Sequence, residues 1–369
     1  MSSKVTAKKH EPLIHIAKRD SMSPIKAILI RLGSVVAALI VCAIVTMALS
    51  GENPIHVYAT MIDGAFGTSR RIWNLLQELA MLLCVSLAVT PAFKMRFWNI
   101  GAEGQVLVGG LASAACMILF GNKLPNAVLI ITMIIVSVLA GAIWALIPAV
   151  FKATLNTNET LFTLMMNYVG IQLVAYFSRV WENPKGSGAI GVINAATEAG
   201  WLPQIAGKKY LFNIIIVLAL TIFMYIYLKY SKHGYEIAVV GESQNTARYI
   251  GLNVKKVIIR TMLLSGAMCG IAGFLLVSGT SQTINVETAG GRGFTAIMVS
   301  WLAKFDPIVM ILTSFLLAFL QMGAKQISTD FGLDDSFSEI LTGIILFFII
   351  GCEFFINYSI KFNKSREVK

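Results

Sequence analysis

A carboxylate, Glu103, lies inside an apolar stretch of this chain, with two amide side chains, Asn99 and Gln105, beside it. The amides can donate and accept hydrogen bonds, whereas the carboxylate can accept them or take up a proton. A charge at the centre of a bilayer costs about 3 kcal/mol, so such a residue normally faces a bundle interior or a watery cavity. Glu103 therefore either contacts a polar solute or bonds backbone N–H groups freed at a helix break. Asn167, in a later apolar stretch, offers the same choice between an interhelical hydrogen bond and a place on a solute path.

No catalytic or metal-binding pattern accompanies these residues. The sequence contains no Gly-x-x-x-x-Gly-Lys-Ser/Thr, His-Glu-x-x-His or Gly-x-Ser-x-Gly segment. The histidines fall in expected loops, and the five cysteines lie in apolar stretches without a CxxC pair, as small core residues do. We therefore predict no catalytic residue, no metal site, no enzyme activity and no cofactor bound by this chain.

The elements that hold these side chains are predicted to cross a membrane. The chain is 56% hydrophobic and only 13% charged, whereas ordinary domains carry about 25% charged residues. Several apolar runs are close to the roughly 20 residues that span a bilayer. The first run is too long for a signal peptide and is interpreted as an uncleaved helix. The net charge of +11 comes from residues in short segments between the runs, which argues against nucleic acid as a partner.

These runs predict an all-α polytopic membrane protein of about ten transmembrane helices. Residues 1–26 form a basic cytoplasmic tail that could contain a surface helix, 27–358 form the transmembrane domain, and 359–369 form a second cytoplasmic tail. Within the domain, 234–256 is the longest cytoplasmic segment and 181–209 an extracellular loop. The expected spans are 27–50, 73–93, 97–120, 126–151, 159–180, 210–229, 257–279, 291–303, 306–326 and 339–358.

Charge fixes the predicted orientation. With loops assigned alternately, 21 of the 30 Lys and Arg residues fall on the side of the two termini and nine on the other. Because cytoplasmic loops are enriched in these residues, both termini are predicted to be cytoplasmic.

Two of the spans are poor membrane helices. Residues 97–120 are rich in glycine and polar side chains, and the span at 291–303 is short and begins in a glycine-rich stretch, Gly290, Gly291 and Gly293. Each is the second span of a group, and the two groups would cross the membrane in opposite directions. This pattern indicates broken helices in two inverted repeats.

A short capped helix is predicted in the cytoplasmic segment. Ser243 suits the N-cap position and Gly251 the left-handed position after a helix end. The helix between them would be about two turns long, on the order of 11 Å. Ala247, Tyr249 and Ile250 give it an apolar side. It is either a solvated connector or a knob that docks into a cleft on a partner.

Four segments resemble, in order, the permeases of ABC importers for nucleosides and simple sugars, a branched-chain amino acid permease-like family. FWNIGAEGQ at 97–105 is similar to that family's FNIGxEGQ signature. The other three are 158–168, 240–254 and 291–297. The likeness covers about 73–350 and is nearest to nucleoside permeases served by basic-membrane-protein-type lipoproteins. The chain departs from the pattern at Thr246 and at Trp301, which would alter the shape of a pore.

The resemblance implies a subunit of a larger complex in the bacterial plasma membrane. Its partners would be an ABC ATPase, a second related or identical permease, an extracellular substrate-binding lipoprotein and membrane lipid. In this family the ATPase often consists of two fused ATP-binding domains, which bind ATP and Mg²⁺. The side chains implied to border the substrate path are Asn99, Glu103, Gln105, Asn167 and Phe294. The residues implied to couple to the ATPase are Gly241, Glu242, Ser243, Asn245, Ala247, Arg248 and Gly251.

The leading hypothesis is an ABC-importer permease that moves nucleosides, or related simple sugars, by ATP-driven alternating access. The alternative is a secondary transporter or channel with inverted repeats, in which Glu103 carries a coupling proton.

Overall fold

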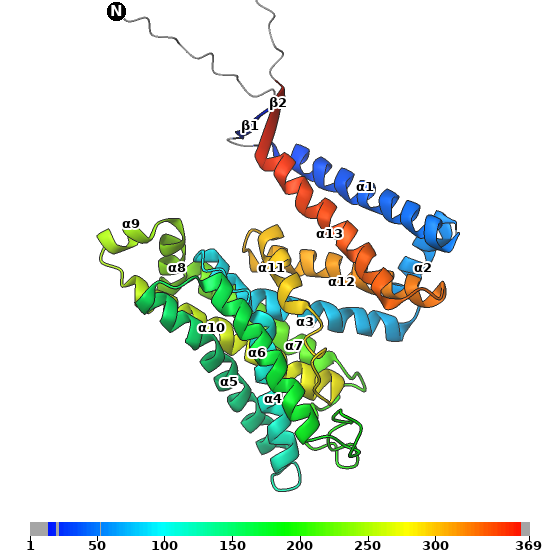
Figure 1. Ribbon diagram of the computed structural model, residues 1–369, viewed down its shortest axis with the longest axis vertical. Coiled ribbons are helices and arrows are strands. Elements are labelled where there is room, and N and C mark those ends of the chain that lie inside the picture. The colour runs from blue at the N-terminus through cyan, green and yellow to red at the C-terminus, as the bar shows by residue number, and fades with distance from the viewer. Residues whose placement is uncertain (1–13, 20–21, 52, 363–369) are drawn as a thin grey trace, which may run out of the picture. The chain divides into compact units, whose positions relative to one another are not determined.

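The computed structural model describes residues 14–19, 22–51 and 53–362. Among these residues, nine helices are long and apolar enough to cross a membrane. The chain divides into two compact units: Met1–Gly64 with Gln321–Lys369, and Ala65–Leu320. Figure 1 shows the elements of each unit. In order, they are β1 (Ile14–Lys18), α1 (Pro24–Ser50), α2 (Pro54–Phe66), α3 (Ser69–Lys94), α4 (Ala102–Phe120), α5 (Asn126–Leu155), α6 (Glu159–Val180), α7 (Leu211–Tyr230), α8 (Lys232–Glu242), α9 (Gln244–Tyr249), α10 (Val254–Phe274), the π-helix η1 (Leu275–Ser281), α11 (Arg292–Leu302), α12 (Pro307–Asp330), α13 (Asp335–Asn357) and β2 (Tyr358–Phe362).

The first unit pairs the two ends of the described chain. Helices α1 and α13 pack together, and Arg31 donates to the carboxylate of Glu353 at 2.6 Å. Strands β1 and β2 form an antiparallel ribbon in which Ile14 pairs with Phe362. The ribbon brings the segment before α1 next to the segment after α13. The surface helix expected in the N-terminal tail was wrong for 14–18, because Ile14 and Ile16 alternate with His15 and Ala17 at the period of a strand. Residues 1–13 and 363–369 of the two predicted tails lie outside the described part.

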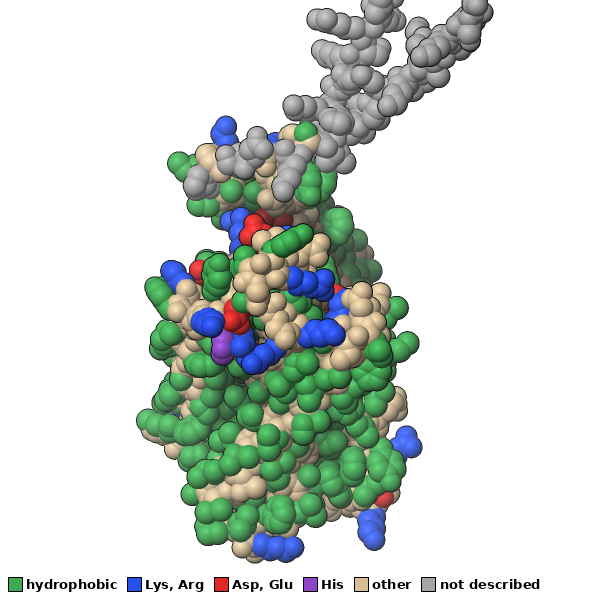
Figure 2. Space-filling model, turned by 90° about the vertical axis from the view of Figure 1, so that its left-hand side faces the viewer, with side chains coloured by type: hydrophobic (Ala, Val, Ile, Leu, Met, Phe, Trp, Pro, Cys, Tyr) green, Lys and Arg blue, Asp and Glu red, His purple; other side chains and the backbone are tan. Residues whose placement is uncertain are grey.

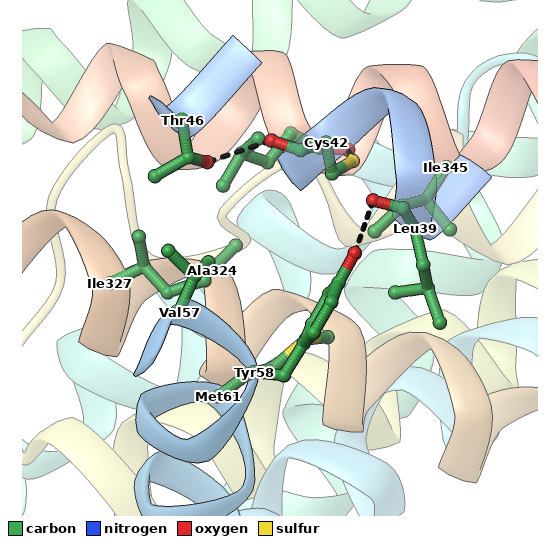
Figure 3. Close-up of a pocket in the computed structure, with 10 residues that line it drawn as sticks. Leu39, Cys42, Thr46, Val57, Tyr58, Met61, Ala324, Ile327 and Ile345 are labelled. Atoms are coloured by element: carbon green, nitrogen blue, oxygen red, sulfur yellow. Dashed lines mark hydrogen bonds between the residues drawn. The ribbon is translucent and has the colours of Figure 1, made fainter. Parts of the chain in front are cut away.

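A small apolar cavity lies between α1, α2, α12 and α13 within this unit (Figure 3). The hydroxyl of Tyr58 donates to the carbonyl of Leu39 at 2.6 Å, and that of Thr46 donates to the carbonyl of Cys42 at 2.8 Å. The cavity measures about 10 Å³, which is at the limit for one water molecule. Its polar groups are already bonded, so we interpret it as core packing.

The second unit is built around α10, which packs against α3, α4 and α5. Glycine makes the closest crossing possible. A Cβ at Gly270 would overlap the carbonyl of Ser137, and one at Gly266 would overlap that of Gly141. Small residues of this kind let helix backbones approach closely where lipid provides no hydrophobic driving force.

Of the two helices predicted to be broken, α4 begins later in the chain than predicted and α11 is short. Residues 97–101 are not helical, and α4 begins only at Ala102. Helix α11 has 11 residues, too few to cross a bilayer, and begins after two glycines with positive φ, Gly290 and Gly291. The described structure thus has a long helix at nine of the ten predicted spans and the short α11 at the tenth. The helix α2 falls in a stretch that was predicted to be a loop.

Candidate functional site

Glu103 joins the starts of α4 and α11. One carboxylate oxygen accepts a hydrogen bond from the N–H of Gly291 at 2.7 Å, and the other accepts one from the N–H of Gly293 at 2.6 Å. The first N–H groups of a helix have no partner inside the helix, and its N-terminus carries a partial positive charge. A buried carboxylate satisfies both needs. Two roles were predicted for Glu103, and these contacts correspond to the helix-capping role.

Gly293 allows this approach. A Cβ at Gly293 would come within 2.7 Å of a carboxylate oxygen of Glu103 and within 2.8 Å of its Cα. The glycine therefore lets the first turn of α11 lie directly against the first turn of α4. Two helix N-termini meet here inside the second unit, an arrangement that transporters use at their central sites.

The amide side chains cap α4. Asn167 accepts from the N–H of Gly104 at 2.8 Å and donates to the carbonyl of Ile100 at 2.6 Å. Asn99 accepts from the N–H of Gly101 and from the side chain of Gln105, both at 3.1 Å. All three amides are buried. In this conformation they support the helix start, and their place on a substrate path remains a prediction.

An ion pair that the sequence analysis did not identify lies beside Glu103. Arg292 Nη2 lies 2.7 and 2.6 Å from the two carboxylate oxygens of Glu78, and its Nη1 donates to the carbonyl of Ala289. Both side chains are partly exposed, at 19% for Arg292 and 35% for Glu78. A charged pair within membrane-spanning helices normally marks a bundle interior or a water-filled path. Because the two charges cancel, this ion pair adds polar atoms to the site but no net charge.

The free face of α11 is aromatic. Phe294 and Trp301 are exposed at 43% and 47%, and seven residues apart on a helix they share one face. The ring of Trp301 stacks on that of Trp98 with centroids 5.6 Å apart. The predicted path residue Phe294 therefore lies on the surface, unlike the buried amides.

A second buried polar cluster stabilises the π-helix η1. Gln77 donates to Thr280 Oγ1 at 2.5 Å, and Asn213 donates to Gln77 Oε1 at 3.3 Å. Asn213 packs directly on Gly279, where a side chain would overlap it. Such π-turns inside α-helices are frequent at functional sites. In the sequence, the feature that could have indicated this cluster is the presence of polar residues near the starts of two apolar runs.

The predicted coupling segment forms two helices, α8 and α9. Ser243 caps α9 by accepting from the N–H of Thr246 at 3.2 Å, and Gly251 has φ +82° just after the helix, so both predicted ends are confirmed. Ala247 is buried, whereas Asn245, Arg248 and Tyr249 are exposed, Tyr249 at 91%. The exposed side of α9 is therefore available to a partner.

The segment is anchored through Gly241. A Cβ there would overlap the carbonyl of Lys94 at the end of α3. Glu242 follows on the surface. The segment is thus held to α3 by this backbone contact and joined to α10 by the chain that follows Gly251.

Comparison with known proteins decides the family. Residues 71–350 match the family described as branched-chain amino acid transport system / permease component. The chain belongs to this permease family. The match begins in α3 and continues into α13.

Individual relatives cover nearly the whole permease. It is 29% identical over 351 residues to the guanosine ABC transporter permease protein NupP of Bacillus subtilis, covering 94% of this chain and 97% of the relative. It is 28% identical to the glucose ABC transporter permease protein TsgB13 of Haloferax volcanii, covering 89% and 88%. It is also 28% identical to the nucleoside ABC transporter permease protein NupB of Lactococcus lactis, covering 88% and 91%.

These findings confirm the predicted family, the all-α polytopic fold, the multi-pass plasma-membrane location and the role of an ABC-importer permease. The permease is a transport component rather than an enzyme, and the family implies an ATPase and other ABC components. The secondary-transporter alternative is not favoured.

Proposed function

We propose that this permease imports nucleosides, using ATP hydrolysed with Mg²⁺ on a separate ATPase polypeptide. The observation that carries the proposal is the likeness to a guanosine permease over 94% of the chain. A second permease subunit would complete the path, and an extracellular lipoprotein would deliver the substrate.

The local chemistry fits a neutral, polar substrate with a ring. The pairing of Arg292 with Glu78 cancels two charges, and Glu103 is engaged by backbone N–H groups. The aromatic face at Phe294 and Trp301 offers flat apolar surfaces. Aromatic side chains stack on nucleobases with little dependence on the base. We therefore place the path along the free face of α11.

Transport would be driven from α9. Its exposed residues, Asn245, Arg248 and Tyr249, would seat in a cleft of the ATPase, and Gly241 would transmit the motion to α3. The cap at Ser243 fixes the start of this short helix, which would help it to pass on such a displacement.

A sugar is the second candidate substrate. The 28% identity to a glucose permease over 89% of the chain favours it specifically. A sugar would use the same hydrogen-bonding groups, but would leave the aromatic face without a planar partner.

Uptake by the reconstituted complex tests the proposal. Proteoliposomes containing the permease, its second permease subunit, its ATPase and its lipoprotein would be given labelled guanosine, uridine, ribose or glucose. We expect ATP-dependent accumulation of nucleosides, and none with an ATPase that cannot hydrolyse ATP. Uptake that persists with the inactive ATPase would reject ATP-driven import, and uptake of sugars alone would reject the nucleoside assignment.

A further inference from the structure

Two adjoining clefts lie where α8 meets the start of α10. The first measures about 280 Å³ and is lined by Lys232, His233, Glu236, Leu252, Asn253, Lys256, Val257 and Arg260. The second measures about 450 Å³ and is lined by Asn253, Lys255, Lys256, Ile259, Arg260 and Leu263. Asn253, Lys256 and Arg260 line both clefts, so the two volumes share one wall.

The clefts carry a surplus of positive charge. Arg260 pairs with Glu236, and this hydrogen bond lowers the pKa of the Glu236 carboxyl, which keeps it ionised. Three further cations, Lys232, Lys255 and Lys256, are exposed around the openings against this single carboxylate. The Nε of Arg260 is buried without a hydrogen-bond partner among the described residues. The site is therefore suited to an anion.

The second cleft continues from these charges onto an apolar surface. Lys256, Ile259 and Leu263 follow one another on the same face of α10. From Lys256 to Leu263 the helix rises about 10 Å toward the interior of the span. Ile259 and Leu263 are half-buried, although most of α10 is buried. Figure 2 shows Lys and Arg side chains gathered in a band above a largely hydrophobic surface.

We propose that the two clefts bind an anionic phospholipid. Its phosphate would lie near Lys255, Lys256 and Arg260, and an acyl chain would follow Ile259 and Leu263. The cytoplasmic leaflet is rich in anionic lipids, which basic pockets between membrane helices recognise. A soluble phosphate would use the charges alone, and so would an acidic side chain of the ATPase. The apolar continuation is what favours a lipid. This inference does not depend on which substrate the permease carries.

Lipid retention by the intact complex tests the site. The purified complex of permease and ATPase would be examined by native mass spectrometry with phosphatidylglycerol, with phosphatidylcholine, and with phosphatidylglycerol in competition with glycerol phosphate. The permease without its ATPase would be examined in the same way. We expect preferential retention of phosphatidylglycerol. The double substitution Lys255→Gln and Lys256→Gln should weaken this retention about tenfold, because each cation near the membrane surface adds to the attraction.

A matched control removes the same charge elsewhere. Lys123 and Lys185 are exposed on segments predicted to lie on the opposite side, and Lys123→Gln with Lys185→Gln should leave retention unchanged. Three results would overturn the proposal: equal retention of the two lipids, displacement by glycerol phosphate at similar concentration, or lipid binding only after the ATPase is removed. The second would indicate a simple anion site, and the third a surface that belongs to the ATPase.

Discussion

Replacing Gly270 with alanine is expected to cause a large loss of stability in this permease. The new Cβ would overlap the carbonyl oxygen of Ser137 and lie within 3.1 Å of the Cα of Val138. Both obstacles are backbone atoms of α5, so they cannot rotate away, and α5 and α10 must separate. Overpacking of this kind costs about 1–3 kcal/mol, and more where the neighbours are rigid. The midpoint of thermal unfolding in detergent should fall clearly.

The matched control is Gly343→Ala. Gly343 lies inside α13, and a Cβ there meets nothing within 4 Å. Because alanine favours a helix over glycine by about 1 kcal/mol, this variant should be as stable as the wild type or more so. Equal unfolding midpoints for the two variants would show that the crossing of α5 and α10 is looser than described.

Replacing Glu103 should have the largest effect on transport. In Glu103→Ala the N–H groups of Gly291 and Gly293 lose their acceptors. An unsatisfied buried donor costs about 1–3 kcal/mol, so the start of α11 should detach from α4. Uptake should be lost and the unfolding midpoint lowered. Glu103→Gln should be milder in both respects, because its amide oxygen can still accept one of the two bonds.

The pair of measurements also separates the two roles of Glu103. If this residue carried a coupling proton, Glu103→Gln would abolish uptake while leaving thermal stability intact. Parallel losses of uptake and stability, larger for alanine than for glutamine, are what capping requires. An exposed carboxylate provides the control, and Glu198→Gln should change neither quantity.

Much of this architecture could be predicted from local patterns. Apolar runs placed nine long helices, and the ends of α9 were correctly predicted from Ser243 and Gly251 because a cap depends on neighbours within a few residues. Glycine content predicted that 97–120 would be a broken helix and that the span at 291–303 would be short, whereas the start of α4 at Ala102 rather than 97 was not predicted.

Contacts between distant segments could not be predicted in this way. Glu78 and Arg292 are 214 positions apart, and only the fold brings them together. The same holds for the clustering of Gln77, Asn213 and Thr280 around η1, and for the pairing of β1 with β2. Glu103 could be identified from the sequence because burying a charge is costly. Its two partners, the N–H groups at the start of α11, could be identified only from the structure.

The account depends most on α9 being the place where the ATPase acts, and cysteine labelling at Tyr249 tests this directly. All five native cysteines are buried, so Tyr249→Cys would be the main site of reaction with a membrane-impermeant maleimide. We predict slow labelling in the assembled complex and rapid labelling once the ATPase is removed. Lys185→Cys, on the loop predicted to be extracellular, should react equally in both states. Equally rapid labelling of Tyr249→Cys with and without the ATPase would contradict the account.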